Sequence, residues 1–259
     1  YADNIAGQII AVDNNHHLIV AAGHSHGIVP IQTPDQGSTW NLCNGLPAGN
    51  WLYGAWFAAP NSKPLAVGFG SDVGMAWAAK GATGSTTLTI YKSTDSGANF
   101  NPTLNTITVG ASMTSVYLLA VPGHPGHLWV TGNNAGGLWQ STDWGDTWTS
   151  KSRPSVSVAG FDKPGYFSIG AIDPVSGTYP TLWMMAGNSG DPTQQGALFY
   201  SIDGATSWTA LGSHGLSGIK PDLPLGQQMY GLGAVRADRQ VFKRLYCGAG
   251  QMGFASYNP

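Results

Sequence analysis

The stretch Ser141-Thr142-Asp143-Trp144-Gly145-Asp146-Thr147-Trp148 decides the fold, because the chain repeats it. Near copies occur three more times, at Thr33-Pro34-Asp35-Gln36-Gly37-Ser38-Thr39-Trp40, at Ser93-Thr94-Asp95-Ser96-Gly97-Ala98-Asn99-Phe100 and at Ser201-Ile202-Asp203-Gly204-Ala205-Thr206-Ser207-Trp208. Four copies in one chain indicate a repeated structural unit.

Each copy predicts a tight turn. The Ser or Thr hydroxyl and the Asp carboxylate can bond to nearby backbone N–H groups, and Gly adopts backbone conformations that other residues resist. The aromatic residue at the end then starts the next strand and is expected to enter the core. These residues are Trp40, Phe100, Trp148 and Trp208. In the fourth copy Gly204 comes one position early and Ala205 takes the usual Gly place, which predicts a turn of different construction.

The spacing of the copies predicts an all-β fold. Their aspartates are 60, 48 and 60 positions apart, which fits the four-stranded blades of a β-propeller with loop insertions. Short apolar runs predict strands at 8–12, 18–22, 28–32, 39–43, 53–59, 65–69, 88–92, 99–102, 115–121, 127–131, 137–140, 147–151, 165–171, 181–186, 197–200, 207–211, 230–235, 244–248 and 253–257. Residues 70–87 are expected to form a long loop, and the fifth unit stops one strand short. We therefore expect about five blades in a single domain, 1–259.

Composition narrows the function classes. Only 9% of the residues are charged and the net charge is −2, so nucleic acid is not an expected partner. No apolar run reaches the roughly 18 residues that a membrane span needs. Scarce Lys, Arg and Glu favour an extracellular or virion-surface location. The chain begins without Met or a signal-like segment, which suggests a processed product or a piece of a longer chain.

The cysteines and histidines bear on two questions, whether the chain has a disulfide and whether it binds a metal. Cys43 and Cys247 lie near opposite ends of the chain, so a disulfide that closes a ring and two buried thiols are both open. His24-Ser25-His26 places two imidazoles on one face of an extended segment, but no Cys, Asp or Glu nearby completes a metal site. No metal or cofactor is therefore expected.

The repeated motif resembles the Asp box, S/T-x-D-x-G-x-T/S-W, of sialidases, sortilin-type receptors and family 74 glycoside hydrolases. In those families the box joins the two outer strands of a propeller blade, away from the substrate face. The resemblance therefore implies structural rather than catalytic roles for Asp35, Asp95, Asp143 and Asp203.

Further segments resemble, in the same order, the C-terminal part of the family 74 xyloglucanases. They are Cys43-Asn44-Gly45-Leu46-Pro47-Ala48-Gly49, Ile90-Tyr91-Lys92, Val121-Pro122-Gly123-His124-Pro125-Gly126-His127-Leu128-Trp129, Gly136-Gly137-Leu138-Trp139-Gln140, Ile169-Gly170-Ala171-Ile172, Thr178-Tyr179-Pro180-Thr181-Leu182-Trp183 and Arg244-Leu245-Tyr246-Cys247-Gly248. Those enzymes are paired propellers with a glucan cleft, and they invert the anomeric centre with two carboxylates, one per propeller. The matching part begins after both, so the resemblance implies that this chain lacks the catalytic acids.

One stretch of the sequence could still contain a catalytic acid. Gly70-Ser71-Asp72-Val73-Gly74-Met75 is similar to the family's Asp-Val-Gly-Gly segment, although Met75 replaces the second Gly and its position in the chain differs. Chance similarity in a Gly-rich loop is the favoured reading. Asp72 is the one candidate catalytic acid on this minority reading.

Sugar rings stack on aromatic side chains, so exposed Trp and Tyr residues are the expected platforms. The candidates are Trp51, Trp77, Trp56 and Tyr230. The leading hypothesis is a xyloglucanase-like propeller that forms one wall of a β-glucan cleft, with hydrolysis only if a companion domain, such as a second propeller, supplies carboxylates. The alternative is a non-enzymatic extracellular propeller that binds a glycan or serves as part of a phage tail or surface fibre.

Overall fold

The computed structural model describes residues 8–12, 18–21, 30–47, 53–55, 57–58, 75–81, 86–109, 115–121, 123–132, 137–154, 164–186, 197–210, 235–248 and 254–257. All the regular elements in these ranges are strands, and they form five sheets. The chain divides into two compact units. Unit 1 comprises Tyr1–Gly132 and Leu138–Ser150, and unit 2 comprises Asn133–Gly137 and Lys151–Pro259.

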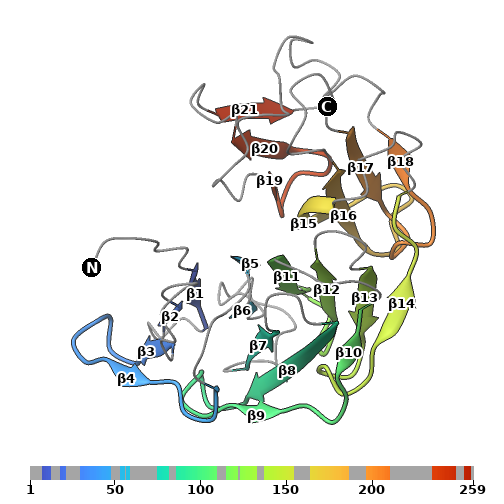
Figure 1. Cartoon of the computed structure of the whole chain (residues 1–259). Helices are drawn as coiled ribbons and strands as arrows, with labels where there is room; N and C mark the ends of the chain where they lie inside the picture. Colours follow the sequence, from blue (N-terminus) through green and yellow to red (C-terminus); the bar gives the residue numbers. More distant parts are fainter. Residues whose placement is uncertain are drawn as a thin grey trace. The chain divides into compact units, whose positions relative to one another are not determined.

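Sheet 1 of unit 1 shows the basic pattern. Its strands are β1 (Gln8–Ala11), β2 (Leu18–Ala21), β3 (Ile31–Thr33) and β4 (Asn41–Leu42), and they pair in sequence order. Every neighbouring pair is antiparallel (Figure 1). This up-and-down order needs only short connections and matches the strands predicted from the first unit of the sequence.

Sheets 2 and 3 extend the pattern and are linked to each other. Sheet 2 contains β6 (Phe57–Ala58), β7 (Ala76–Lys80) and β8 (Thr87–Ser93), with β9 (Asn101–Pro102) and β10 (Ile107–Thr108) on opposite ends of β8. Sheet 3 contains β11 (Ser115–Ala120), β12 (Leu128–Gly132), β13 (Leu138–Ser141) and β14 (Thr149–Lys151). One edge strand of this sheet, β5 (Tyr53–Ala55), pairs parallel with β11. Since β5 is only one residue from β6, this short stretch joins the two sheets.

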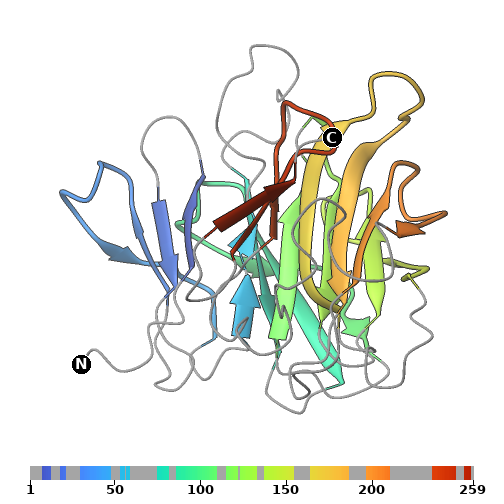
Figure 2. The same ribbon diagram turned by 90° about the horizontal axis from the view of Figure 1, so that it is seen from above.

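Unit 2 holds the remaining two sheets. Sheet 4 contains β15 (Pro164–Ile172), β16 (Pro180–Ala186), β17 (Ala197–Ser201) and β18 (Thr209–Ala210), which lie side by side in Figures 1 and 2. Sheet 5 contains β19 (Val235–Ala237), β20 (Leu245–Gly248) and β21 (Phe254–Tyr257). Ala237 N–H donates to Ser168 Oγ (3.0 Å) and Ala171 N–H to Asp238 O (2.8 Å), so the two sheets are hydrogen-bonded to each other.

One predicted loop contains a strand. Residues 70–87 were expected to form a loop, yet β7 runs through Ala76–Lys80 and pairs with β8 over its whole length. Ala76, Ala78 and Ala79 carry little β-propensity, but they are buried together with Trp77, so packing outweighs propensity here. The strand expected at 65–69 lies outside the described residues.

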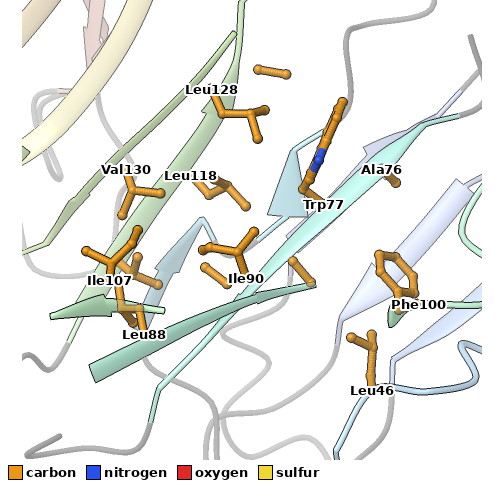
Figure 3. Packing of buried hydrophobic residues seen from close by; sticks show 14 of the residues in the cluster. Leu46, Ala76, Trp77, Leu88, Ile90, Phe100, Ile107, Leu118, Leu128 and Val130 are labelled. Carbon is orange, nitrogen blue, oxygen red and sulfur yellow. The ribbon is translucent and has the colours of Figure 1, made fainter. Parts of the chain in front are cut away.

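The core of unit 1 lies between the sheets. Leu88 and Ile90 of β8 are fully buried, whereas the intervening Thr89 is only half-buried, as the two-residue period of a strand requires. These side chains meet Leu118 of β11 and Val130 of β12 (Figure 3). Burying each such side chain contributes roughly 1.5–3 kcal/mol.

The segment that follows β4 packs closely on the turn between β8 and β9. Asn44 N–H donates to Ala98 O (2.9 Å) and Phe100 N–H donates to Asn44 O (2.8 Å). At Gly45, with φ +78°, an added Cβ would lie 1.9 Å from Phe100 O. Only a glycine fits between these two backbones.

We predict that Gly45→Ala destabilises the protein far more than Gly123→Ala does. Both glycines have nearly equal positive φ (+78° and +77°), but a Cβ on Gly123 would meet nothing within 4 Å. Gly123→Ala should cost about 1–2 kcal/mol for the backbone conformation alone, and Gly45→Ala about 1–3 kcal/mol more because the backbones must separate. Urea denaturation of both variants measures the difference, and equal losses would contradict the close approach.

Candidate functional site

The four repeated turns are the best-defined polar sites in the described part of the chain. They are turn 1 (residues 33–40), turn 2 (93–100), turn 3 (141–148) and turn 4 (201–208). Each joins two antiparallel strands that are consecutive in the chain, namely β3–β4, β8–β9, β13–β14 and β17–β18. This position is the one that the sequence predicted.

A buried hydroxyl stands at the start of each turn. In turn 3, Ser141 Oγ donates to Asp143 Oδ1 (2.8 Å) and accepts from Gly145 N–H (2.9 Å). The equivalent bonds recur in the other three turns, and all four hydroxyl residues are at most 2% exposed. Because a buried hydroxyl without partners is costly, each one requires its aspartate and the following loop.

The aspartate closes the other half of the turn. Asp143 Oδ1 accepts from Thr147 N–H (2.8 Å), and Oδ2 accepts from the Thr147 hydroxyl (2.5 Å). In turn 2 the Asn99 amide replaces the hydroxyl. Burial by itself raises the pKa of Asp143, but the bonds from Thr147 and Ser141 outweigh it, so this pKa lies below its ordinary value. The carboxylate is therefore held ionised inside the turn.

Turn 4 corrects a prediction. Its altered Gly position suggested a different construction, yet Ala205 N–H donates to Ser201 Oγ (2.9 Å) just as Gly does in the other copies. Gly204 and Ala205 have φ of 67° and 65°, and two consecutive residues with positive φ also occur in the other three turns. The hydrogen bonds impose the backbone shape, and Ala205 adopts it at an energetic cost.

The aromatic residues at the ends of the turns differ in burial. Phe100 is 2% exposed, as predicted, and Trp148 packs against the core of unit 1 while donating to Gly145 O (2.9 Å). Trp208 is half-buried and donates to Ser152 O (2.9 Å). Trp40 does not enter the core, because it is 47% exposed and its ring lies against Gly37 of its own turn.

Turn 3 is also tied to sheet 2, which the sequence analysis did not predict. Lys92 Nζ forms an ion pair with Asp146 (3.2 Å), and Asn105 Nδ2 donates to Asp146 O (2.7 Å). Trp77 Nε1 donates to Trp144 O (2.9 Å). Nothing in the motif marks these residues, since their partners are far away in sequence.

All thirteen acidic residues of the chain are aspartates, and seven are described. The three outside the repeat position are also engaged: Asp146 in its ion pair, Asp173 with Ser176 Oγ (2.7 Å), and Asp238 with Gln240 N–H (2.8 Å). The hydrogen bond from Ser176 lowers the pKa of Asp173, and that from Gln240 lowers the pKa of Asp238. A general acid needs a raised pKa, so the six aspartates whose pKa is lowered do not fit that role, and Asp146 is held in its ion pair with Lys92.

Most of the predicted site residues lie outside the described residues. These are Asp72, Trp51, Trp56 and Tyr230. Five further aspartates, none of them predicted as a site residue, also lie outside the described residues: Asp3, Asp13, Asp162, Asp191 and Asp222. Trp77 is described and was misjudged: its side chain is fully buried in β7 and leaves no face for a sugar. It was expected in a loop, where Trp side chains are exposed.

Cys43 is a buried free thiol. Burial, with a smaller contribution from the Asp95 charge, raises its pKa to about 12. This favours the buried-thiol interpretation of Cys43 over a disulfide, while the side chain of Cys247 lies outside the described residues.

Two kinds of feature are absent from the described residues. No group of three or more His, Cys, Asp or Glu side chains is arranged to hold a metal ion. A helix of the length and hydropathy needed for a membrane span is likewise absent from these residues.

Comparison with known proteins identifies the fold. No family model matches the chain. A xyloglucanase from Paenibacillus sp. is 27% identical over 239 residues, which is 79% of this chain and 20% of that protein. The GH74 enzyme of Niastella koreensis aligns with a TM-score of 0.64 and 21% identity, covering 96% of this chain and 30% of its own. The GH74 xyloglucanase of Xanthomonas campestris aligns with a TM-score of 0.62 and 20% identity, over 94% of this chain and 28% of that protein.

The fold is a β-propeller. Five sheets of mostly antiparallel strands in sequential order are its blades, and the last has three strands in the described residues. The chain spans only about a fifth of the length of the xyloglucanase it matches. The predicted fold class is thus confirmed, and the similarity is to the propellers of GH74 enzymes.

We predict that Ala205→Gly stabilises the protein. The substitution relieves the unfavourable positive φ of Ala205, which costs a residue with a side chain about 1–2 kcal/mol. The greater freedom of Gly in the unfolded chain offsets part of this, leaving a gain of about 0.5–1 kcal/mol. Thermal unfolding measures the gain. Gly145→Ala, at φ +89°, is the converse control and should destabilise.

We predict that the turns lose stability in acid. A carboxylate whose folded pKa is below its unfolded value stabilises the fold above the unfolded pKa, and this contribution disappears as the pH falls through the folded pKa. For Asp143 the loss therefore falls below about pH 4. Asp143→Asn should be less stable at pH 7, and the gap to the parent protein should narrow towards pH 2. Urea denaturation of both proteins between pH 2 and pH 7 measures this difference in stability. A difference that stays the same at every pH would contradict the prediction.

Proposed function

We propose that this chain is a carbohydrate-active propeller that forms one wall of a β-glucan-binding cleft. The observation that carries the proposal is the 239-residue match to a xyloglucanase, which runs through most of the chain at 27% identity. The propeller fold, similar to that of GH74 enzymes over nearly the whole chain, supports it. We further propose that residues 1–259 form a single propeller domain, that it works beside a second propeller, and that it is extracellular.

The binding surface is proposed to lie away from the four turns. We infer that these turns are Asp boxes, since their hydroxyl and carboxylate groups follow the S/T-x-D pattern and bond within the turn. Saturated polar groups of this kind have little left to offer a sugar. Trp51, Trp56 and Tyr230 remain the proposed stacking platforms.

Hydrolysis by this chain alone is not part of the proposal. An inverting glycosidase needs two carboxyl groups roughly 6.5–9.5 Å apart, one of them with a raised pKa. The described aspartates are hydrogen-bonded or ion-paired, and six of them have lowered pKa values. A companion domain is therefore proposed to supply the catalytic pair. Asp72 is the one residue of this chain proposed as an alternative acid.

A second candidate is a glycan-binding or structural propeller with no enzymatic role. The engagement of all seven described aspartates favours it, because a binding module requires no titrating acid. A glycan-binding module would share a sugar-binding wall with the first candidate but would have no part in turnover, whereas a structural propeller would bind no sugar.

We predict that the chain binds xyloglucan oligosaccharides without cleaving them. Calorimetric titration measures binding, and a reducing-sugar assay on the same samples measures turnover. Trp51→Ala should weaken binding, whereas Trp40→Ala, which removes an exposed indole at a turn, should not.

Three outcomes separate the possibilities. Turnover that disappears in Asp72→Ala would show that this chain carries its own acid. Binding of glycans other than β-glucans would favour the second candidate. Absence of both binding and turnover would contradict the proposed cleft wall.

A further inference from the structure

Residues 44 and 45 form a chemically labile pair inside a tight contact. Asn44-Gly45 is the only Asn-Gly pair in the sequence, since every other asparagine precedes a residue with a side chain. Asparagine is thermolabile because the nitrogen of the next residue can attack its side-chain carbonyl carbon and release ammonia. A following side chain hinders this attack, whereas glycine does not. Asn44 is therefore the asparagine at which we expect deamidation to be fastest once the backbone is free to move.

The fold holds this pair against turn 2. Asn44 N–H donates to Ala98 O (2.9 Å), and Asn44 O accepts from Phe100 N–H (2.8 Å). These two bonds form a parallel bridge between Asn44 and Asn99, which keeps the backbone of Asn44 extended. Gly45 is so close to Phe100 O that the contact leaves no room for even a methyl group. Both residues of the labile pair are thus fixed in one backbone conformation.

This conformation opposes deamidation. The reaction passes through a five-membered imide ring that contains Cα, Cβ, Cγ and the main-chain carbonyl carbon of Asn44, together with the nitrogen of Gly45. The ring is nearly planar, so Cβ and that nitrogen must lie on the same side of the Cα–C bond, and in an extended residue they lie apart. Rotation about the Cα–C bond turns the Asn44 carbonyl away from Phe100 N–H. The hydrogen bond from Phe100 must therefore break before the ring can close.

We propose that Asn44-Gly45 is a deamidation site that is silent while its contact with turn 2 is closed and that reacts when this contact opens. The nitrogen of Gly45 bonds to Cγ of Asn44, the Cγ–Nδ2 bond breaks, and Nδ2 leaves as ammonia with the proton of the Gly45 N–H. Water then opens the imide. Cleavage between the nitrogen and Cγ gives aspartate, and cleavage between the nitrogen and the main-chain carbonyl carbon gives isoaspartate. The side chain of Asn44 is exposed, so solvent supplies the water.

Neither product fits the closed contact as asparagine does. Asn44 Nδ2 donates to Asn99 Oδ1 (3.4 Å), and Asn99 is held in this orientation because its own Nδ2 donates to Asp95 Oδ2 (2.7 Å). An ionised aspartate at position 44 has no proton for Asn99 Oδ1, and it adds a negative charge two hydrogen bonds away from Asp95. Isoaspartate lengthens the main chain by one CH₂ group where two backbones are already in contact. The reaction therefore makes the opening of the contact irreversible.

The contact connects sheet 1 with sheet 2. The segment that contains Asn44 follows β4, and turn 2 joins β8 to β9. Leu46 and Phe100, which flank the contact, are both buried in the core of unit 1 (Figure 3). Opening of the contact thus disturbs this core, and deamidation would fix the disturbed state. The inference does not rest on the proposed function, because it uses only this contact and its neighbours.

Peptide mass spectrometry tests the site in protein kept at mildly alkaline pH, with and without guanidinium chloride. Alkaline pH is used because the attacking nitrogen must lose its proton. We expect position 44 to deamidate before any other asparagine in the denaturant, and at least about tenfold more slowly in native buffer, a difference of about 1.4 kcal/mol in activation free energy. Isoaspartyl methyltransferase detects the isoaspartate product. Equal rates in the two conditions, or no reaction at position 44 in the denaturant, would overturn the proposal.

Two matched variants show whether the local contact controls the reaction. Phe100→Ala removes a buried ring beside the contact, and Phe199→Ala removes a buried ring from sheet 4 in unit 2. Phe100→Ala should raise the native rate at position 44 by about tenfold or more, because local opening becomes easier, whereas Phe199→Ala should leave it near that of the parent. Phe100→Leu should raise it less, and it decides the question if Phe100→Ala does not fold. Equal acceleration by Phe199→Ala would show that the reaction waits for global unfolding, and would overturn the role of the contact.

The irreversibility is tested on the reacted protein. Ion exchange separates the deamidated chains, which are refolded beside unreacted chains given the same treatment. We expect the deamidated chains to show a lower urea midpoint and faster hydrogen exchange at Phe100 N–H, because Asn44 O no longer accepts from it. Asn44→Gln keeps an amide but cannot close a five-membered ring, so this control should release no ammonia at position 44. Identical exchange at Phe100 in reacted and unreacted chains would overturn the claim that the contact cannot close again.

Discussion

The buried hydroxyl at the head of each turn is the interaction on which the sheets depend. Thr33, Ser93, Ser141 and Ser201 each end the strand that precedes their turn, and their side chains are buried. Each must find a carboxylate and a backbone N–H, and only a loop with two consecutive positive-φ residues brings both into reach. The hydroxyl therefore fixes where the strand ends and how the chain returns as the outermost strand.

This constraint also explains which sequence changes the turns accept. Ala205 replaces a glycine in turn 4, yet every bond from Ser201 and Asp203 is retained. Asn99 replaces a hydroxyl residue in turn 2, because an amide N–H can also donate to Asp95 Oδ2 (2.7 Å). The turns tolerate changes at positions that supply a shape or a donor, whereas the aspartate that accepts from both sides is present in all four copies.

The fold could be predicted from the sequence because its signals are local. A hydroxyl, an aspartate and an aromatic residue within eight positions specify a turn, and apolar alternation specifies the strands around it. The β7 strand escaped prediction because Ala76, Ala78 and Ala79 say little about strand formation, and their burial depends on sheets formed by distant residues. Trp77 was misjudged for the same reason, since its partner, Trp144 O, is 67 positions away.

Local signals do not identify a site in the same way. The aspartates that dominate the sequence pattern are held ionised by their turns, so the most repeated acid is the least suited to proton transfer. Arg236 and Tyr246 show the converse, because they are ten positions apart and become cross-strand neighbours only through the β19–β20 register. In this propeller the repeated residues build the sheets, and the chemistry available to a ligand lies in the side chains that are not repeated.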